Sequence, residues 1–221
     1  IRVWGNMRRI LVTGAGGYIG TALVPLLLKA GYHVRAVDRF FFGRDLLAAD
    51  DRLEVIREDA RHLEQSHFGG IHAVIDLVAI SNDPSGEAFQ DATWAINMEA
   101  RVRTARLARA SRVKRYILPS SCSIYGFLPA DTIADENTAT NPLTTYAKAN
   151  EKAEQGVLAL AAGDFSVVVL RQATVYGYAP RMRFDLAING EPVGAWKTGR
   201  LPLMRDGSQW RPMVHVRDTA R

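Results

Sequence analysis

The sequence has a single cysteine, Cys122. A lone cysteine excludes an internal disulfide and is typical of a chain kept in a reducing cytoplasm. Cysteine and histidine pairs at metal-ligand spacing are also lacking, so we expect no metal. No apolar run approaches the roughly 20 residues that span a bilayer. The first residues, IRVWGNMRR, lack the apolar core of a signal peptide. We therefore expect a cytoplasmic protein without a membrane partner.

Nucleic-acid-binding motifs are lacking too, although the net charge is +5. Much of the excess positive charge lies between residues 101 and 115, where apolar residues recur at helical intervals. The basic residues of this segment are Arg101, Arg103, Arg106, Arg109, Arg112, Lys114 and Arg115. The pattern predicts the solvated face of an amphipathic helix, with attraction of anionic substrates as a further possibility. Without an aromatic platform for bases, we expect no nucleic-acid partner.

The distribution of apolar residues indicates the fold. Strand-like apolar runs alternate with helical patterns, which predicts a doubly wound α/β fold with a parallel sheet covered on both faces. The expected strands are 9–13, 33–37, 53–57, 73–78, 115–119, 167–170 and 213–216, and the expected helices are 19–30, 93–111 and 145–162. The pattern loosens beyond Tyr176. We therefore expect a dinucleotide-binding domain at 1–175 and the start of a smaller substrate lobe at 176–221.

The most informative segment is LVTGAGGYIG at residues 11–20. An apolar strand leads into a turn with Gly14, Gly17 and Gly20, and an apolar helix follows. Glycine allows positive φ and close approach of a ligand to the backbone. The helix then presents free N–H groups and a positive dipole end to an anion. This context predicts a dinucleotide phosphate site.

Asp38 closes the second expected strand. A carboxylate at this position can accept hydrogen bonds from both hydroxyls of an adenosine ribose, and it would repel a 2′-phosphate. The pattern therefore favours NAD over NADP. Arg39 keeps NADP open as an alternative, because a cation beside the acid could accept that phosphate.

A candidate reactive pair follows later in the chain. Ser121 lies just after the fifth expected strand, and Tyr146 opens a helix. The serine can donate a hydrogen bond to a substrate oxygen, while the tyrosine transfers a proton as hydride moves to or from a nicotinamide. The alternative is a loop serine and a tyrosine that only packs.

The order and spacing of these segments resemble the extended short-chain dehydrogenases/reductases, in particular the NAD-dependent sugar epimerase/dehydratase family. The segments that match are TGAGGYIG, Asp38, EDAR at 58–61, VIDLVA at 74–79, Asn97-Met98, SSCSIYG at 120–126, the Tyr146 helix, LRQATVYG at 170–177 and WRPMVHVRD at 210–218. The resemblance implies a Rossmann-type fold with a C-terminal substrate lobe. Relatives continue past the position of Asp218. We therefore expect 176–221 to be the beginning of that lobe in a longer protein, or else the rest of the lobe to be absent.

The resemblance also implies a role for each matched residue. Cofactor binding falls to Gly14, Gly17, Tyr18, Ile19 and Gly20 at the pyrophosphate, Asp38 with Arg39 beside it at the adenosine ribose, Asp59 and Ala60 at the adenine, Leu77, Val78 and Ala79 along the dinucleotide path, and Asn97 as a brace for the active-site helix. Catalysis falls to Ser121 and Tyr146, with Asn150 as the third position. Substrate binding falls to Ser123, Thr174 and Arg211, the last matching an arginine that contacts the diphosphate of a nucleotide sugar.

The sequence departs from the family at Asn150, where a lysine is expected four residues after the tyrosine. Lys148 and Lys152 do not replace it, because at about 100° per residue both face away from this stripe of the helix. Free tyrosine has a pKa near ~10, so only about one in a thousand would be ionised at pH 7 without help. Asn150 can bond the ribose but brings no charge. We expect weakened activity or a pH optimum shifted upward, with the nicotinamide charge as a partial substitute.

Two further departures narrow the reaction. Cys122 and Ser123 stand where 4,6-dehydratases carry an Asp-Glu pair, which disfavours dehydration. Thr174 stands where many epimerases carry an asparagine. The leading interpretation is an NAD-dependent nucleotide-sugar epimerase. The alternatives are an NAD(P)-dependent keto-sugar reductase and, because of Asn150, a dinucleotide-binding protein without turnover. A homodimer through helix 93–111 is expected by family resemblance. The sugar, nucleotide and carbon are not encoded in these motifs.

Overall fold

The computed structural model describes residues 8–43, 45–129, 132–201 and 210–221. Six parallel strands form one sheet in the order β3-β2-β1-β4-β5-β6, which confirms the doubly wound Rossmann-type fold. These strands are β1 (Arg9–Thr13), β2 (His33–Asp38), β3 (Leu53–Arg57), β4 (Ile71–Asp76), β5 (Arg115–Ser121) and β6 (Ser166–Gln172).

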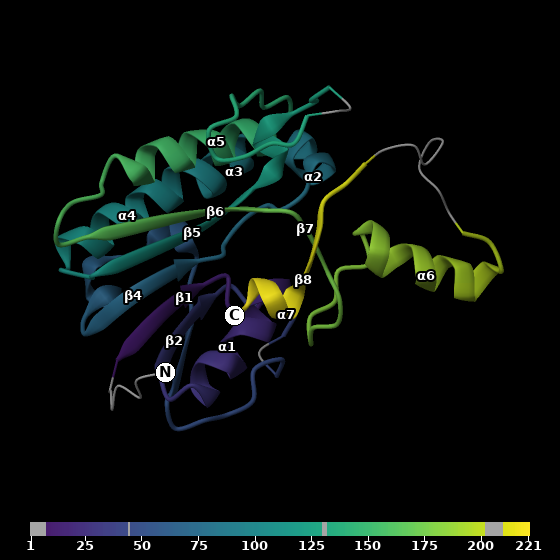
Figure 1. Cartoon of the computed structure of the whole chain (residues 1–221). Coiled ribbons are helices and arrows are strands. Elements are labelled where there is room, and N and C mark those ends of the chain that lie inside the picture. The colour runs from purple at the N-terminus through teal and green to yellow at the C-terminus, as the bar shows by residue number, and fades with distance from the viewer. Residues whose placement is uncertain (1–7, 44, 130–131, 202–209) are drawn as a thin grey trace.

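Helices cover both faces of this sheet, and of the helices given next only α6 projects away from it (Figure 1). They are α1 (Tyr18–Lys29), α2 (Asp83–Ala88), α3 (Gln90–Trp94), α4 (Arg101–Ala110), α5 (Thr145–Leu158), α6 (Ala187–Thr198) and α7 (Val216–Thr219). In Figure 1, α4 and α5 lie over one face and α1 lies over the other. Short 3-10 turns follow β3 and β5, the latter at η4 (Cys122–Tyr125).

Alternation along β1 divides the interior into two cores. Leu11 packs with Val102 of α4 and Ala153 of α5, whereas Ile10 and Val12 belong to the core formed with α1. Successive side chains of a strand point to opposite faces, so a continuous apolar run is what a doubly covered strand requires.

The expected helix at 93–111 is present but interrupted. Between α3 and α4 the chain forms a π-helical segment, η3 (Ala95–Ala100), with Asn97 inside it. Such wide turns occur mostly as local insertions, often at functional sites. The expected helix at 145–162 ends earlier, at Leu158. A turn at 163–164, closed by a bridge between Ala162 and Phe165, leads directly into β6.

The last part of the chain begins with β7 (Thr174–Tyr176), which pairs in parallel with β8 (Met213–His215). The expected strand at 213–216 is one residue shorter, because Val216 begins α7. A hydrogen bond of 2.5 Å from the Tyr18 hydroxyl to the Gly177 carbonyl ties this part to α1. Helix α6 projects from the body of the molecule in Figure 1. The division at residue 175 falls inside β7 and stays a prediction.

Membrane-spanning helices and metal-binding clusters were searched for in the described ranges only. Within them, no helix combines the length and apolarity required to cross a membrane. The same ranges contain no group of three or more His, Cys, Asp or Glu side chains that could hold a metal ion.

The close packing of α4 on α5 yields a test of the fold. A Cβ added at Gly156 would lie 2.6 Å from Cγ2 of Val102, which is buried and β-branched. Alanine normally favours a helix over glycine. Here we expect Gly156→Ala to lower the free energy of unfolding by about 1–3 kcal/mol, because the helices must move apart.

Gly163→Ala is the matched control, since an added Cβ meets nothing there within 4 Å. Chemical denaturation of both variants measures the difference. Equal stability of the two variants would contradict the packing argument.

Candidate active site

The turn after β1 packs directly against the chain after β4. Gly14 has a φ of +65°, and an added Cβ would lie 2.8 Å from the carbonyl carbon of Leu77 and from the nitrogen of Val78. At Gly20 an added Cβ would lie 2.5 Å from the carbonyl oxygen of Gly14. Backbone atoms cannot yield as a flexible side chain can, so only glycine fits at these two positions.

Helix α1 begins beyond this turn with Gly17 as its N-cap, and no side chain caps it. The first backbone N–H groups of a helix have no partner within the helix. Those of Tyr18, Ile19 and Gly20 stand at that end, so they are suited to an anion such as a pyrophosphate. The Tyr18 hydroxyl is not available to bind a ligand. It donates a hydrogen bond to the Gly177 carbonyl and accepts one from Nδ2 of Asn189 at 3.1 Å.

Asp38 is oriented at the end of β2 by two backbone donors. Its Oδ1 accepts from the nitrogen of Phe40 at 2.6 Å, and its Oδ2 accepts from the nitrogen of Gly16 at 3.1 Å. Each carboxylate oxygen keeps a further lone pair. The carboxylate therefore lies beside the glycine turn with acceptor capacity left for a ribose diol.

Arg39 is engaged elsewhere. Its Nη1 lies 3.3 Å from Oδ2 of Asp59, and its guanidinium lies 4.3 Å from the centre of the Phe41 ring. Asp59 also pairs with Arg61 at 2.7 Å, and the Arg61 hydrogen bond is the main cause that lowers the pKa of Asp59 to about 2. Ala60 is buried beside it. The NADP alternative depends on Arg39 as the partner of a 2′-phosphate. Because Arg39 is already paired with Asp59, this alternative loses support.

The segment after β4 is held by a side chain from η3. The buried amide of Asn97 accepts from the nitrogen of Ile80 and donates to its carbonyl, both at 2.9 Å. Its bonds thus brace the chain next to Leu77, Val78 and Ala79, the expected dinucleotide path. Because η3 also packs against α5, the expected role of Asn97 as a brace for the active-site helix stays a prediction.

Ser121 and Tyr146 lie at the same edge of the sheet. Ser121 ends β5, and its Oγ accepts from the hydroxyl of Ser123 at 2.9 Å. Tyr146 lies in the first turn of α5, which begins at the N-cap Thr144 and packs against β5 and η4. The ring is half-buried, and its Cβ lies close to Gly86 of α2. The end of β5 and the first turn of α5 thus bring these two residues to the carboxyl edge of the sheet.

Asn150 is almost wholly buried, at 1% exposure. Its Nδ2 donates to the carbonyl of Tyr146 at 2.9 Å. Its Oδ1 accepts from Nη1 of Arg101 at 2.7 Å. Lys148 and Lys152 are exposed, which confirms that they face away from this stripe.

The prediction of a solvated face is wrong for Arg101. Its side chain is buried at 2% exposure, with Nε donating to the Val78 carbonyl at 3.0 Å. The solvated face is confirmed for Arg103, Arg106 and Arg109. A signal was present in the sequence, because Arg101 shares a helical stripe with Ala105 and Ala108, which are buried.

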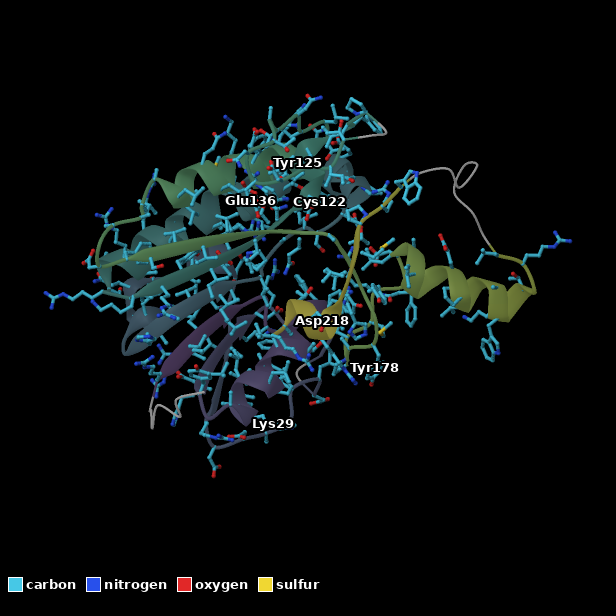
Figure 2. The ribbon with its side chains drawn as sticks, viewed as in Figure 1. Lys29, Cys122, Tyr125, Glu136, Tyr178 and Asp218 are labelled. Carbon is cyan, nitrogen blue, oxygen red and sulfur yellow. The ribbon has the colours of Figure 1, made fainter. Side chains whose placement is uncertain are left out.

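The remaining candidates lie where the last part of the chain meets β5. The nitrogen of Thr174 donates to the Pro212 carbonyl at 3.1 Å, so Thr174 and Arg211 belong to adjacent segments. Burial raises the pKa of the Cys122 thiol, and the charge of Arg211 partly opposes this. Arg211 is thus near enough to act on the residue beside Ser121. Figure 2 shows Cys122 close to Tyr125, above the sheet.

The model for the NAD dependent epimerase/dehydratase family matches residues 10–221. Among curated proteins, the chain is 29% identical to an uncharacterised UDP-glucose epimerase, YtcB of Bacillus subtilis (strain 168), over 96% of this chain and 70% of that one. Among solved structures, MoeE5 in complex with UDP-glucuronic acid and NAD is similar with a TM-score of 0.85 and 32% identity, over 96% of this chain and 69% of that one.

A second similar structure is UDP-glucuronic acid 4-epimerase from Bacillus cereus in complex with UDP-glucuronic acid and NAD. It has a TM-score of 0.86 and 26% identity, over 96% of this chain and 70% of that one. NAD is the cofactor of this family, and the glycine turn and the oriented carboxylate of Asp38 fit it. With the family model matching nearly its whole length, this chain belongs to the NAD-dependent epimerase/dehydratase family of enzymes.

Proposed function

We propose that this chain is an NAD-dependent nucleotide-sugar epimerase that inverts a hydroxyl-bearing carbon. The observation that carries the proposal is the arrangement of Ser121 and Tyr146 at the edge of the sheet where Gly14 and Asp38 also lie. The relatives support the substrate class, because those that are similar over 96% of this chain include proteins described as UDP-sugar epimerases.

The proton chemistry belongs to two hydroxyl groups of the protein. Tyr146, with its own hydroxyl deprotonated, accepts the proton of the substrate hydroxyl and later returns it to the same oxygen. Ser121 donates a hydrogen bond to that oxygen throughout, and Ser123 orients the Ser121 hydroxyl from 2.9 Å. NAD, when bound, supplies the acceptor and then the donor of the hydride. Return of the hydrogen to the opposite face of the sugar inverts the carbon without net oxidation.

Arg211 is the proposed contact for the substrate diphosphate. Its guanidinium is exposed and always charged, and its forked donors match phosphate oxygens. Ser123 and Thr174 are the proposed neighbours of the sugar. Dehydration stays disfavoured, because the raised pKa of the Cys122 thiol keeps it protonated at neutral pH and unsuited to act as a base.

No observation favours a keto-sugar reductase over this proposal. A binding protein without turnover was considered because Asn150 brings no charge to the site. Arg101, a buried cation, donates a hydrogen bond to Asn150, which makes this alternative less favoured. The homodimer and the cytoplasmic location stay predictions.

The proposal is tested by denaturing the purified protein, identifying any released nucleotide by mass, and assaying UDP-sugars for conversion to an epimer. The expected result is stoichiometric NAD and an epimer formed without added cofactor. Net consumption of reduced cofactor would favour a reductase, and NAD binding without conversion of any UDP-sugar would favour a binding protein.

Tyr146→Phe tests the proton transfer. We expect turnover to fall about 10²–10⁴-fold, because the hydroxyl that exchanges the proton is gone. NAD affinity should change little. Tyr178→Phe is the matched control, since Tyr178 is 73% exposed. Turnover in Tyr146→Phe equal to that of the control would remove Tyr146 from the mechanism.

Asp38→Asn tests the preference for NAD. The backbone donors of Gly16 and Phe40 orient a carboxylate here, and an amide loses both the charge and one acceptor. We expect NAD to bind about tenfold more weakly and the discrimination against NADP to shrink, as one charge-assisted bond is worth about 1.5–3 kcal/mol. Titrations of both nucleotides measure this. Asp51→Asn, at the opposite end of the sheet, is the control, and identical affinities in the two variants would contradict the assignment.

A further inference from the structure

We propose that Arg101 is a positioning residue that supplies, through Asn150, the positive charge that the family places four residues after the tyrosine. The inference rests on the proposed function, because it concerns the same site. It reverses the expectation that no cation of the chain lies against this stripe of α5, because Arg101 reaches it from α4.

Two helical stripes face each other at this point. Arg101 lies one turn after Asn97 on η3 and α4, and Asn150 lies one turn after Tyr146 on α5. The guanidinium of Arg101 reaches across both. Its Nε donates to the Val78 carbonyl at 3.0 Å, and its Nη1 donates to Asn150 at 2.7 Å. It therefore joins the expected dinucleotide path to the helical turn that carries Tyr146.

The burial of Arg101 explains why residue 150 is an asparagine. In the part of the chain that the structure describes, no carboxylate lies within ion-pair distance of Arg101. A buried charge is tolerated when its donors are satisfied by acceptors. Asn150 provides an acceptor to Arg101 and a donor to the Tyr146 carbonyl. A lysine at 150 would place a second cation against the first, so the residues at 101 and 150 form a matched pair.

Other ionisable groups surround the pair. Tyr116 of β5 donates to the Arg101 carbonyl at 3.1 Å and to Asp76 of β4. Burial, followed by the Asp76 charge, raises the pKa of Tyr116 well above its usual range, so Tyr116 stays neutral. From α2, Glu87 accepts from the nitrogen of Thr145, and Asp83 accepts from Thr144. Arg101 is thus a buried cation that is linked through Asn150 to the backbone of the turn that carries Tyr146.

The proposed role of this charge has two consequences. A cation near the reacting hydroxyl favours its deprotonation, and a cation near the nicotinamide disfavours the positively charged NAD⁺ relative to NADH. A residue that only packs would produce neither effect. The pH–rate profile and the ratio of NADH to NAD⁺ affinity therefore separate the two roles.

The first test removes the charge in two ways. Arg101→Gln deletes the cation, and Asn150→Asp neutralises it while keeping an acceptor for the guanidinium. We expect both to move the pH–rate profile to higher pH by about one unit, which lowers turnover at neutral pH about tenfold. Arg101→Lys, which keeps the charge, should retain most of the turnover. Arg106→Gln is the matched control, because it removes an exposed arginine from the same helix.

The second test exchanges the pair. Asn150→Lys alone should lower thermal stability, because two cations would share one buried site. Arg101→Gln combined with Asn150→Lys should restore both stability and the wild-type pH–rate profile. A double-mutant cycle over the four proteins measures this coupling.

The third test needs no turnover. NAD⁺ and NADH are titrated into each protein, and the ratio of NAD⁺ affinity to NADH affinity is compared. We expect this ratio to be about tenfold higher in Arg101→Gln and in Asn150→Asp than in the wild type. If no UDP-sugar is converted by the wild type, the proposed function fails and this ratio alone decides the inference. A pH–rate profile and an affinity ratio in Asn150→Asp and Arg101→Gln that equal those of Arg106→Gln would overturn it. If Arg101→Gln does not fold, Asn150→Asp decides by the same readouts.

Discussion

The pairing of β1 with both β2 and β4 is the constraint on which the candidate site depends. Thr13, the last residue of β1, lies opposite Val37 on one side and Asp76 on the other. Its hydroxyl bonds Asp76. Because β1, β2 and β4 are parallel and their carboxyl ends are aligned, the segments that follow these three strands all begin at one edge of the sheet. The glycine turn, the ribose carboxylate and the chain after β4 are therefore brought together by backbone pairing alone, before any side chain of the site is considered.

A second link joins this edge to the reactive hydroxyls. The segment after β4 is held by Asn97 and Arg101, which lie on consecutive turns of the interrupted helix, and Arg101 in turn bonds Asn150 of α5. The cofactor path and the tyrosine helix are thus connected through one buried polar network. In a low-dielectric interior, such a network is stable only when its members are satisfied together. This is why a change at residue 150 has to be considered together with the residue at 101.

Much of the fold was predictable, because the signals are local. The strand at 9–13 is a buried run with the predicted ends, and Gly14 and Asp38 follow from the turn and strand patterns. Helix α6 was missed, because it is exposed, contains Pro192 and has only Asn189 buried, so its apolar period is weak. Arg101 was misplaced, because its burial depends on Asn150, a partner 49 positions away that no local pattern reveals. Tertiary partners decide such positions, whereas periodicity decides the strands and the long helices.

The central claim is that the site oxidises and re-reduces one carbon of its substrate without net loss of hydrogen. It is tested most directly with a nucleotide sugar deuterated at the carbon that is inverted, with the product analysed by mass and magnetic resonance. The account predicts that the epimer keeps the deuterium at the same carbon while no reduced nucleotide accumulates in solution. Loss of the label to solvent, or its appearance in free NADH, would contradict the account.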